Sequence, residues 1–282
     1  MLISGYEHNA VCRPLAALES RGVRTVSLPF PLFEPEEAAA QFEAALDDTV
    51  GLVVCVHVSN VFGYILPVER ISVLCKEKGV PLVVDAAQSA GALPIEGDSY
   101  PVWCMPGHKG LYGPQGTGLL LLPPGVLPET LIEGGTGGDS RAKHMPDFLP
   151  ERLEAGTHNA PGAAGLTAGI KFARKNMGNA ESGHLLRFAA EGLASIGGVR
   201  VFAAEHPEFQ TGALSFTVEG KDPEAVAEHL DRQGIAVRAG LHCAPLAHNT
   251  AGTGESGTVR ISFSAYSTRG DISALIRSVK KI

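Results

Sequence analysis

Short apolar runs alternate with amphipathic helical stretches over about the first 125 residues of the chain. The runs predict strands at 25–30, 51–59, 81–88 and 117–123, and the periodic stretches, each with a proline near its start, predict helices at 35–47 and 67–78. Near-continuous valine and leucine strands separated by such helices predict a parallel or mixed sheet covered on both faces. Ligands of such sheets bind beyond the carboxyl ends of the strands.

The pattern changes after residue 124. Residues 124–160 are typical of a loop, and a Gly/Ala-rich helix is expected at about 161–176. The rest of the chain predicts helices at 182–195, 222–233 and 271–281, and strands at 199–204, 212–218, 235–239 and 257–263. We therefore expect a two-domain α/β layout, with a large domain over residues 1–160 and a linking helix plus a smaller α+β domain over residues 161–282.

Composition indicates a folded, non-membrane chain. Of the 282 residues, 44% are hydrophobic, which supports a sizeable core and argues against disorder. The 34 glycines, about 12% against a typical ~7%, indicate many tight turns or close approaches of backbone to a ligand. No apolar run reaches the roughly 18 residues that span a bilayer, and residues 1–15 lack the pattern of a secretory signal.

Charge and cysteine content narrow the setting. A net charge of −7, with basic residues scattered along the chain, argues against a nucleic-acid binder or a membrane-surface protein. The five cysteines show no zinc-ligand spacing, and four of them lie in apolar or helical segments. We expect a cytoplasmic protein with reduced cysteines and no metal site. Cys243 differs from the others because it follows His242 and precedes Ala-Pro.

The segment GHKGLYGPQGTG (107–118) places a lysine among glycines after an apolar strand. Lys109 fits a Schiff-base lysine, whose amine attacks a carbonyl cofactor. A phosphate-binding P-loop does not match, because Gly110 rather than Ser or Thr follows the lysine. An exposed lysine in a turn has about equal weight on this segment alone.

The segment VVDAAQSAG (83–91) shifts that balance. Asp85 ends a buried strand, where an unpaired carboxylate is costly. A protonated pyridine nitrogen would remove that cost, and Asp plus a Schiff-base lysine is the protein side of pyridoxal phosphate chemistry. Gln88, three residues on, could bond a ring substituent. The alternative is an Asp that caps a helix.

These segments belong to a wider likeness. The sequence resembles the class V aminotransferase family of pyridoxal phosphate enzymes, specifically the cysteine desulfurases and selenocysteine lyases. The likeness runs nearly end to end, in family order, through EHNAVCRPL (7–15), HVSNVFG (57–63), VVDAAQSAG (83–91), GHKGLYGPQGTG (107–118), EGGTGGDS (133–140), LEAGTHNAPG (153–162), VRAGLHCAPLAH (237–248) and GTVRISFSAYST (257–268). It implies a fold-type-I transferase: a mainly parallel sheet in the large, pyridoxal phosphate-binding domain plus a smaller α+β C-terminal domain, assembled as a homodimer.

The resemblance assigns the cofactor contacts. It implies that Lys109 forms the Schiff base and later moves protons, and that Asp85 keeps the pyridine nitrogen protonated. His8 would stack on the ring, Gln88 would bond its phenolic oxygen and His108 would contact the phosphate.

The resemblance also assigns substrate contacts. Asn60 would lie near the cofactor and the substrate carboxylate, and Arg260, in an alternating strand, would grip that carboxylate with its guanidinium. Arg238 would support the same site or the neighbouring cysteine loop. Thr157 corresponds to a position that reaches the phosphate of the neighbouring subunit, although a threonine in a Gly-flanked loop is also a common turn former.

Cys243 would accept the sulfur of L-cysteine, or the selenium of selenocysteine, leaving alanine and an enzyme persulfide that a sulfur-acceptor protein could discharge. A nucleophilic cysteine needs thiolate character, and His242 and Arg238 are candidate sources of positive field. A zinc site of His242, Cys243 and His248 lacks a fourth ligand nearby. The short RAGLHCAP stretch resembles the group II branch, which does not separate cysteine from selenocysteine as substrate.

The family pattern has about 90 further residues before EHNAV, including a turn that cradles the cofactor phosphate. On that resemblance the chain is expected to be a fragment or a shortened form. Three hypotheses follow: a desulfurase or selenocysteine lyase, a catalytically impaired fragment that serves folding or dimerisation, and a class V aminotransferase or epimerase-like enzyme in which Cys243 is incidental.

Overall fold

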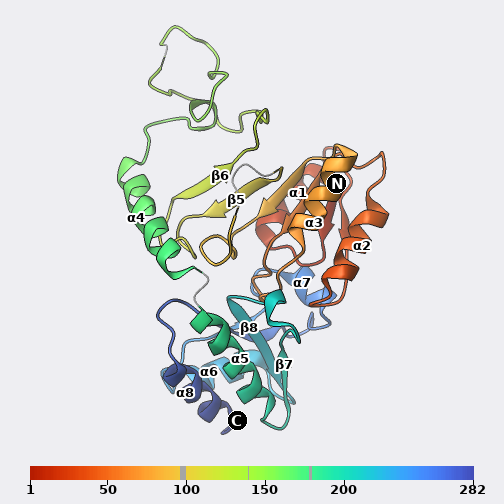
Figure 1. The fold of residues 1–282 in the computed structure, drawn as a ribbon, viewed down its shortest axis with the longest axis vertical. Helices are drawn as coiled ribbons and strands as arrows, with labels where there is room; N and C mark the ends of the chain where they lie inside the picture. The colour runs from red at the N-terminus through yellow and green to blue at the C-terminus, as the bar shows by residue number, and fades with distance from the viewer. Residues whose placement is uncertain (96–99, 139, 178–179) are drawn as a thin grey trace.

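The computed structural model describes residues 1–95, 100–138, 140–177 and 180–282. Two sheets, each with its own hydrophobic core, lie one above the other in Figure 1. We call the first sheet and the helices packed on it the large unit, and the second sheet with its helices the small unit. Of the glycine-rich segment at 133–140, Asp139 lies outside the described residues.

The sheet of the large unit has the strand order β2-β1-β3-β4-β5-β6. Its neighbours pair in parallel except β5 and β6, which are antiparallel, so the sheet is mixed as the sequence predicts. The strands are β1 (Leu2–Ser4), β2 (Val26–Leu28), β3 (Val53–Val56), β4 (Leu82–Asp85), β5 (Val102–Pro106) and β6 (Gly118–Leu121). They are shorter than their apolar runs because the runs continue into buried loops.

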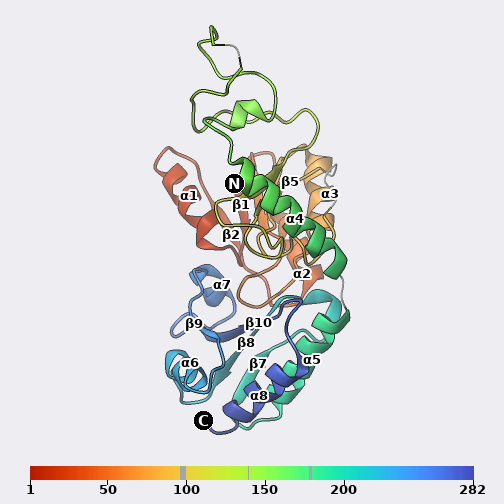
Figure 2. The same ribbon diagram turned by 90° about the vertical axis from the view of Figure 1, so that its left-hand side faces the viewer.

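Helices cover both faces of this sheet, as Figure 2 shows with α1 and α3 on opposite sides. They are α1 (Asn9–Glu19), α2 (Pro35–Ala45) and α3 (Val68–Lys78). Alternation along the strands decides which face each residue serves. Leu2 joins the core that contains Phe42 of α2, whereas Ile3 joins the cluster that contains Leu15 of α1.

Residues 124–138 and 140–159 project from the body before α4 (Ala160–Asn176) returns along the large unit (Figure 1). Apart from the 3₁₀ turn Glu151–Leu153, the described part of this segment is loop, as the sequence predicts. It exposes large apolar side chains, with Leu131 96% and Ile132 71% accessible. Leu166 and Ile170 of α4 pack into or against the core of the large unit.

The small unit is an antiparallel sheet of order β7-β8-β10-β9. Its elements are α5 (Ala180–Ala194), β7 (Val199–Phe202), the 3₁₀ turn Pro207–Phe209, β8 (Ala213–Val218), α6 (Pro223–Asp231), β9 (Arg238–Gly240), β10 (Thr258–Ser262) and α8 (Arg269–Val279). The expected strand at 235–239 is shifted, because Ile235 and Val237 precede β9 and pack against the core there.

The two faces of the small sheet differ in chemistry. Leu214 and Val259 point into the core shared with α5, α6 and α8. Their neighbours Ser215 and Arg260 point the other way and bond to the large unit, where they meet the carbonyls of Val61 and Asn60. The period-2 alternation of β8 and β10 therefore turns a polar face with an arginine toward the large unit.

A short helix, α7 (Pro245–Thr250), fills the space between the two sheets in both ribbon views. Ala244 and Ala247 belong to the core of the large unit, and Thr250 Oγ1 donates to the Gly5 carbonyl at 2.8 Å. The segment that follows β9 is thus packed into the large unit. Within the described residues, no helix is both long and apolar enough to cross a membrane.

Candidate active site

Seven of the predicted site residues converge between the two units, where the parallel strands of the large unit have their carboxyl ends. His8 follows β1, Asn60 follows β3, Asp85 ends β4 and Lys109 follows β5. The small unit contributes Arg238 of β9, Arg260 of β10 and Cys243 of the turn before α7. In parallel sheets this edge is where loops from several strands meet.

Lys109 and Asp85 lie within electrostatic reach of each other. Partial desolvation lowers the pKa of the Lys109 amine, the charge of Asp85 opposes that shift, and Arg260 adds to it. Asp85 Oδ1 accepts the Ala87 N–H at 2.8 Å, which fixes the carboxylate at the strand end. The helix-capping alternative is wrong, because the residues after Asp85 form a turn and not a helix. The bond to Ala87 uses Oδ1, and Oδ2 is the oxygen that could meet a cation.

Glycines bring the loop of Lys109 against the loop of Gln88. A Cβ on Gly110 would meet the Ala90 carbonyl oxygen, and one on Gly91, which has φ +83°, would meet the Gly110 carbonyl. The two backbones are therefore in contact, which only glycine permits at these positions. As a result Gln88 and Lys109 line the same cavity of about 550 Å³, which continues between the two units.

His8 is fixed by its place at the start of α1. Its Nδ1 accepts the Ala10 N–H at 3.0 Å, so the side chain is the N-cap of the helix. Burial, the largest cause, lowers the pKa of His8, Lys109 lowers it further and Asp85 raises it. A lowered pKa and an accepting Nδ1 assign the neutral ring, with its proton on Nε2.

Arg260 and Arg238 face each other across the β10–β9 pair. Arg260 Nη1 donates to the Asn60 carbonyl at 2.7 Å, and its buried Nε has no hydrogen-bond partner among the described residues. Burial and the nearby Arg238 lower the pKa of Arg260, while Cys243 raises it. Two neighbouring guanidinium groups with an unused donor form a site for an anion such as a carboxylate.

Cys243 carries an exposed thiol at this junction. Arg238 Nη2 donates to its Sγ at 3.5 Å. The expectation that His242 also supplies positive charge to this thiol is wrong. His242 is only 2% exposed, and burial, with Arg260, His248 and Arg238, lowers the pKa of its ring to about 3. The ring is therefore neutral near pH 7, and Arg238 alone of the two donates to the thiol.

The remaining predicted residues lie in different settings. His108 is exposed beside Lys109. Asn60 is buried, and its side-chain Nδ2 donates to the His242 carbonyl at 2.9 Å. Thr157 is exposed in the segment that precedes α4, and it is not among the residues that line the cavity of Gln88 and Lys109.

Glu7 is a site neighbour that sequence reasoning missed. Its carboxyl is fully buried, and its Oε1 accepts bonds from Ser4 Oγ and the Val56 N–H. Burial, the largest cause, raises the pKa of Glu7 to about 8, the bonds from Ser4 and Val56 lower it, and Asp85 raises it. The carboxyl is therefore largely protonated at neutral pH. The sequence signal for Glu7 is its position directly before the predicted site residue His8 in EHNAV.

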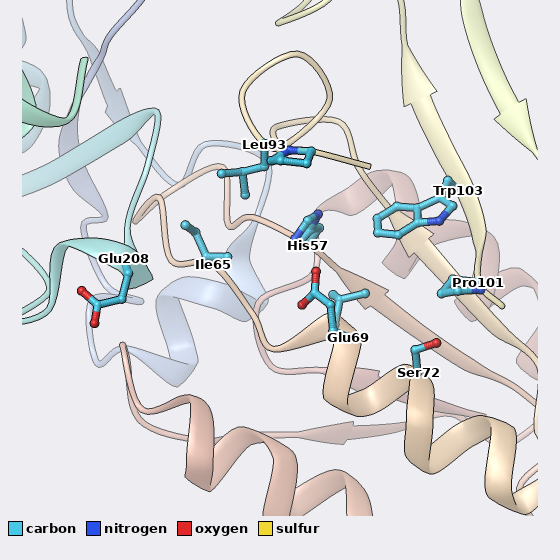
Figure 3. A pocket seen from close by; sticks show the side chains of 10 residues that line it. His57, Ile65, Glu69, Ser72, Leu93, Pro101, Trp103 and Glu208 are labelled. Carbon is cyan, nitrogen blue, oxygen red and sulfur yellow. The ribbon is translucent and has the colours of Figure 1, made fainter. Parts of the chain in front are cut away.

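A second cavity of about 480 Å³ lies away from these residues, on the α3 side of the sheet (Figure 3). Its wall is mainly apolar, and the His57 ring lies 5.5 Å from the Trp103 ring between centroids. Burial lowers the pKa of His57, and Glu69 raises it. The residues around this cavity are His57, Ile65, Val68, Glu69, Ser72, Leu93, Pro94, Pro101, Trp103 and Glu208, a set that lacks a lysine or cysteine nucleophile.

Comparison with known proteins agrees with this fold. The sequence matches the family model described as Aminotransferase class-V over residues 1–275. It is 31% identical to a probable cysteine desulfurase of Methanothermobacter thermautotrophicus, over all of this chain and 72% of that protein. The solved structure of an apo cysteine desulfurase from Thermococcus onnurineus superposes with a TM-score of 0.84 at 29% identity, covering 99% of this chain and 72% of that one.

An Escherichia coli cysteine desulfurase structure gives a TM-score of 0.85 at 26% identity, with 99% of this chain and 71% of that one covered. The architecture is therefore that of a fold-type-I enzyme. The chain belongs to the class V aminotransferase family. It spans 36% of a relative from Mycolicibacterium paratuberculosis, which is 35% identical over 86% of this chain, and 59% of a Pyrococcus abyssi relative, 34% identical over 82% of it.

The residues present fit pyridoxal phosphate, the cofactor of this family. The cofactor needs a lysine amine for its aldehyde and a carboxylate for its ring nitrogen. Lys109 supplies a partly desolvated amine, and Asp85 keeps one oxygen beyond its bond to Ala87. The neutral His8 ring lies within electrostatic reach of both groups. His108, which is exposed and directly precedes Lys109, is the residue that would contact the cofactor phosphate.

Proposed function

We propose that this chain is a pyridoxal phosphate-dependent cysteine desulfurase, which takes sulfur from L-cysteine and leaves L-alanine. One observation carries the proposal: the exposed Cys243 thiol lies beside Arg238, at the cleft where Arg260, Asp85 and Lys109 converge. A thiol is dispensable for transamination, whereas a desulfurase needs a nucleophile for the departing sulfur. The names of the aligned relatives support the same reaction.

When bound, pyridoxal phosphate supplies an electron sink for the bonds to the substrate α-carbon. Lys109 would hold it, and the lowered pKa of Lys109 increases the fraction of neutral amine that can attack its aldehyde. Asp85 would hold the ring nitrogen, Gln88 the phenolic oxygen, and His8 and His108 the ring face and the phosphate.

The other residues act on the substrate. Arg260 binds the α-carboxylate through its unused Nε donor, and its bond to the Asn60 carbonyl holds the guanidinium in place. Lys109 moves a proton at the substrate α-carbon. The Cys243 thiolate attacks the substrate sulfur, so the Cβ–S bond breaks and an S–S bond forms. The β-carbon takes a proton to become a methyl group, and the products are L-alanine and a Cys243 persulfide.

Finer features rest on the same proposal. Selenocysteine fits the same chemistry, because selenium is also a soft atom that a thiolate attacks. A sulfur-acceptor protein would discharge the persulfide, and the exposed position of Cys243 supports such access. We also propose a homodimer in the cytoplasm, in which the projecting segment of residues 124–159 brings Thr157 to the neighbouring subunit. The apolar side chains that this segment exposes support a partner surface there.

The test of function measures sulfide and alanine after L-cysteine is added to the purified chain with pyridoxal phosphate and a reducing thiol. We expect both products in equal amounts, and loss of sulfide release in Cys243→Ala. Cys104→Ala is the matched control, because Cys104 lies within strand β5 and not in the turn that carries Cys243. Undiminished sulfide release from Cys243→Ala would overturn the persulfide route.

Cofactor binding is tested separately by visible absorbance. Pyridoxal phosphate added to the wild type is expected to give the absorbance of a lysine-bound cofactor, and Lys109→Ala is expected to abolish it. Lys171→Ala, on the exposed side of α4, is the control and should leave the absorbance unchanged. Absence of the band from the wild type would favour the impaired-fragment hypothesis.

A further inference from the structure

The turn that carries Cys243 has an unusual backbone. The Ala244 N–H donates to the Leu241 carbonyl at 2.8 Å, which closes a four-residue turn. Its two central residues, His242 and Cys243, have φ of 51° and 56°. Positive φ at both central positions is the property of a type I′ turn, which favours glycine and asparagine. Residues with a Cβ hold such a backbone only where their surroundings fix it.

The surroundings that fix this turn belong to the large unit. Asn60 Nδ2 donates to the His242 carbonyl at 2.9 Å, and the Asn9 N–H donates to the Cys243 carbonyl at 2.8 Å. Asn9 directly follows His8, and Asn60 follows β3, so both donors come from elements that also carry predicted site residues. Ala244, next along the chain, is buried in the core of the large unit.

The His242 ring anchors the turn in the opposite direction, to the small unit. Its Nε2 lies 3.1 Å from the Thr258 carbonyl oxygen and 3.2 Å from Thr258 Oγ1. Thr258 Oγ1 in turn donates to Ser215 Oγ at 3.1 Å, and Ser215 Oγ donates to the Val61 carbonyl at 2.7 Å. This chain of bonds ends next to Asn60, which closes a loop of contacts around the turn.

Asn60 couples the turn to the anion site. Its side-chain amide holds the His242 carbonyl, while its own carbonyl accepts Arg260 Nη1 at 2.7 Å. Arg238, which pairs with Arg260 across the sheet, donates to Cys243 Sγ. Asn60 therefore contacts the cysteine turn through its side chain and the anion site through its backbone.

We propose that Asn60 and His242 are positioning residues that clamp the Cys243 turn between the two units, so that the thiol lies beside Arg238 before any substrate binds. The proposal rests on the proposed function for its role in catalysis, while the clamp itself is a property of the free protein. Asn60 holds the turn from the large unit and the neutral His242 ring holds it from the small unit. Neither residue needs to touch the reacting sulfur.

The first test uses the protein without cofactor or substrate, and measures hydrogen exchange at the Asn9 amide, whose acceptor is the Cys243 carbonyl. In Asn60→Ala and in His242→Asn we expect protection of that amide to fall roughly fivefold or more, the worth of one hydrogen bond. Asn tolerates positive φ but does not carry the ring anchor. Asn9→Ala is the control, because it keeps the backbone N–H that makes the bond.

The second test is the alkylation rate of Cys243 by iodoacetamide in the same free protein, read by mass spectrometry of its peptide. Arg238→Ala is expected to change this rate in the wild type. In the Asn60→Ala or His242→Asn background, Arg238→Ala is expected to leave the alkylation rate of Cys243 unchanged, because the thiol no longer lies beside Arg238. His242→Asn leaves Asn60 intact, so the pair remains informative if Asn60→Ala does not fold.

Activity supplies the third readout. His242→Asn is expected to lower kcat for sulfide release with an unchanged KM for L-cysteine, since substrate binding precedes the step that uses the thiol. Additive alkylation effects, or an Asn9 amide as protected in both variants as in the wild type, would overturn the clamp. Absence of sulfide release from the wild type would instead overturn the proposed function and leave the exchange and alkylation results to decide on the clamp.

Discussion

Replacing Glu7 with glutamine is expected to remove a pH dependence of stability that the buried carboxyl imposes. The folded-state pKa of Glu7 is about 8 against 4.5 for the unfolded chain. Because the folded state holds the proton more tightly, the contribution of Glu7 to stability is fully present below pH 4.5 and is lost as the pH rises toward 8. At about 1.36 kcal/mol per pKa unit, the loss amounts to roughly 4 kcal/mol by pH 8.

Glutamine keeps the Oε1 that accepts the Ser4 hydroxyl and the Val56 N–H but does not titrate. The difference in unfolding free energy between Glu7→Gln and the wild type should therefore move in favour of the variant by about 4 kcal/mol between pH 4.5 and 8. Titrating groups that do not interact with Glu7 cancel in that difference. The slope should be steepest between pH 5 and 7.5, where the unfolded carboxyl is ionised and the folded one is not.

The assay is urea unfolding of the cofactor-free protein at a series of pH values, followed by tryptophan fluorescence. Trp103, the only tryptophan of the chain, lies on β5 of the same unit as Glu7. Glu43→Gln, at an exposed position of α2, is the control and should show a flat difference. A flat difference for Glu7→Gln over the same range would refute the assignment of a protonated Glu7.

Three further outcomes follow from the buried histidines, the glycine contact and the arginine pair. His242 and His248 have folded pKa values of about 3 and 4, against 6.5 in the unfolded chain. Each should therefore lower the unfolding free energy by about 1.4 kcal/mol per pH unit as the pH falls below 6.5. In urea unfolding, the stability of His248→Gln should fall less steeply with acid than that of the wild type. Gly110→Ala should lower the unfolding free energy by roughly 1–3 kcal/mol through its clash with the Ala90 carbonyl, measured by the same unfolding assay. Arg260→Ala should lower kcat/KM for L-cysteine roughly a hundredfold with cofactor absorbance retained.

Matched variants make each of these results interpretable. Gly51→Ala adds a Cβ where nothing lies within 4 Å, so it should leave stability nearly unchanged. Arg260→Lys keeps the charge but not the fork of donors, so partial recovery of kcat/KM would support carboxylate binding. Loss of the cofactor absorbance in Arg260→Ala would instead assign that residue a structural role. If stability falls with acid as steeply in His248→Gln as in the wild type, the His248 ring is not buried in its neutral form.

Periodicity predicted most of the fold, and it failed where local and tertiary effects compete. The helix α1 was missed because Pro14 lies inside it, a residue that normally ends a helical pattern. The helix α7 spans only Pro245–Thr250, too short for an amphipathic repeat, and packing into the large unit stabilises it. The apolar Ile235 and Val237 suggested a strand that begins only at Arg238.

For the candidate site, motifs placed the residues in the right loops but could not supply their surroundings. The place of Asp85 at the end of β4 follows from the strand predicted at 81–88, and Lys109 was placed only as following an apolar strand whose bounds were not predicted. The predicted positive charge of His242 was wrong, because the sequence does not reveal that its ring is buried beside Arg260. The bond from Asn60 to the His242 carbonyl joins positions 182 residues apart, a separation that a single sequence does not reveal.

The contacts that assemble the cleft also dictate when it can form during synthesis. Thr250 meets Gly5 across 245 residues, and Arg260 meets Asn60 across 200. Because a ribosome delivers the chain from its amino end, β1 to β6 emerge long before the segment that completes their core with Ala244 and Ala247. The core of this sheet can therefore be completed only late in translation, and the thiol can lie beside Arg238 only when nearly the whole chain has been made. Ribosome-bound chains that end before residue 240 should consequently hold the lysine loop but not a completed cleft.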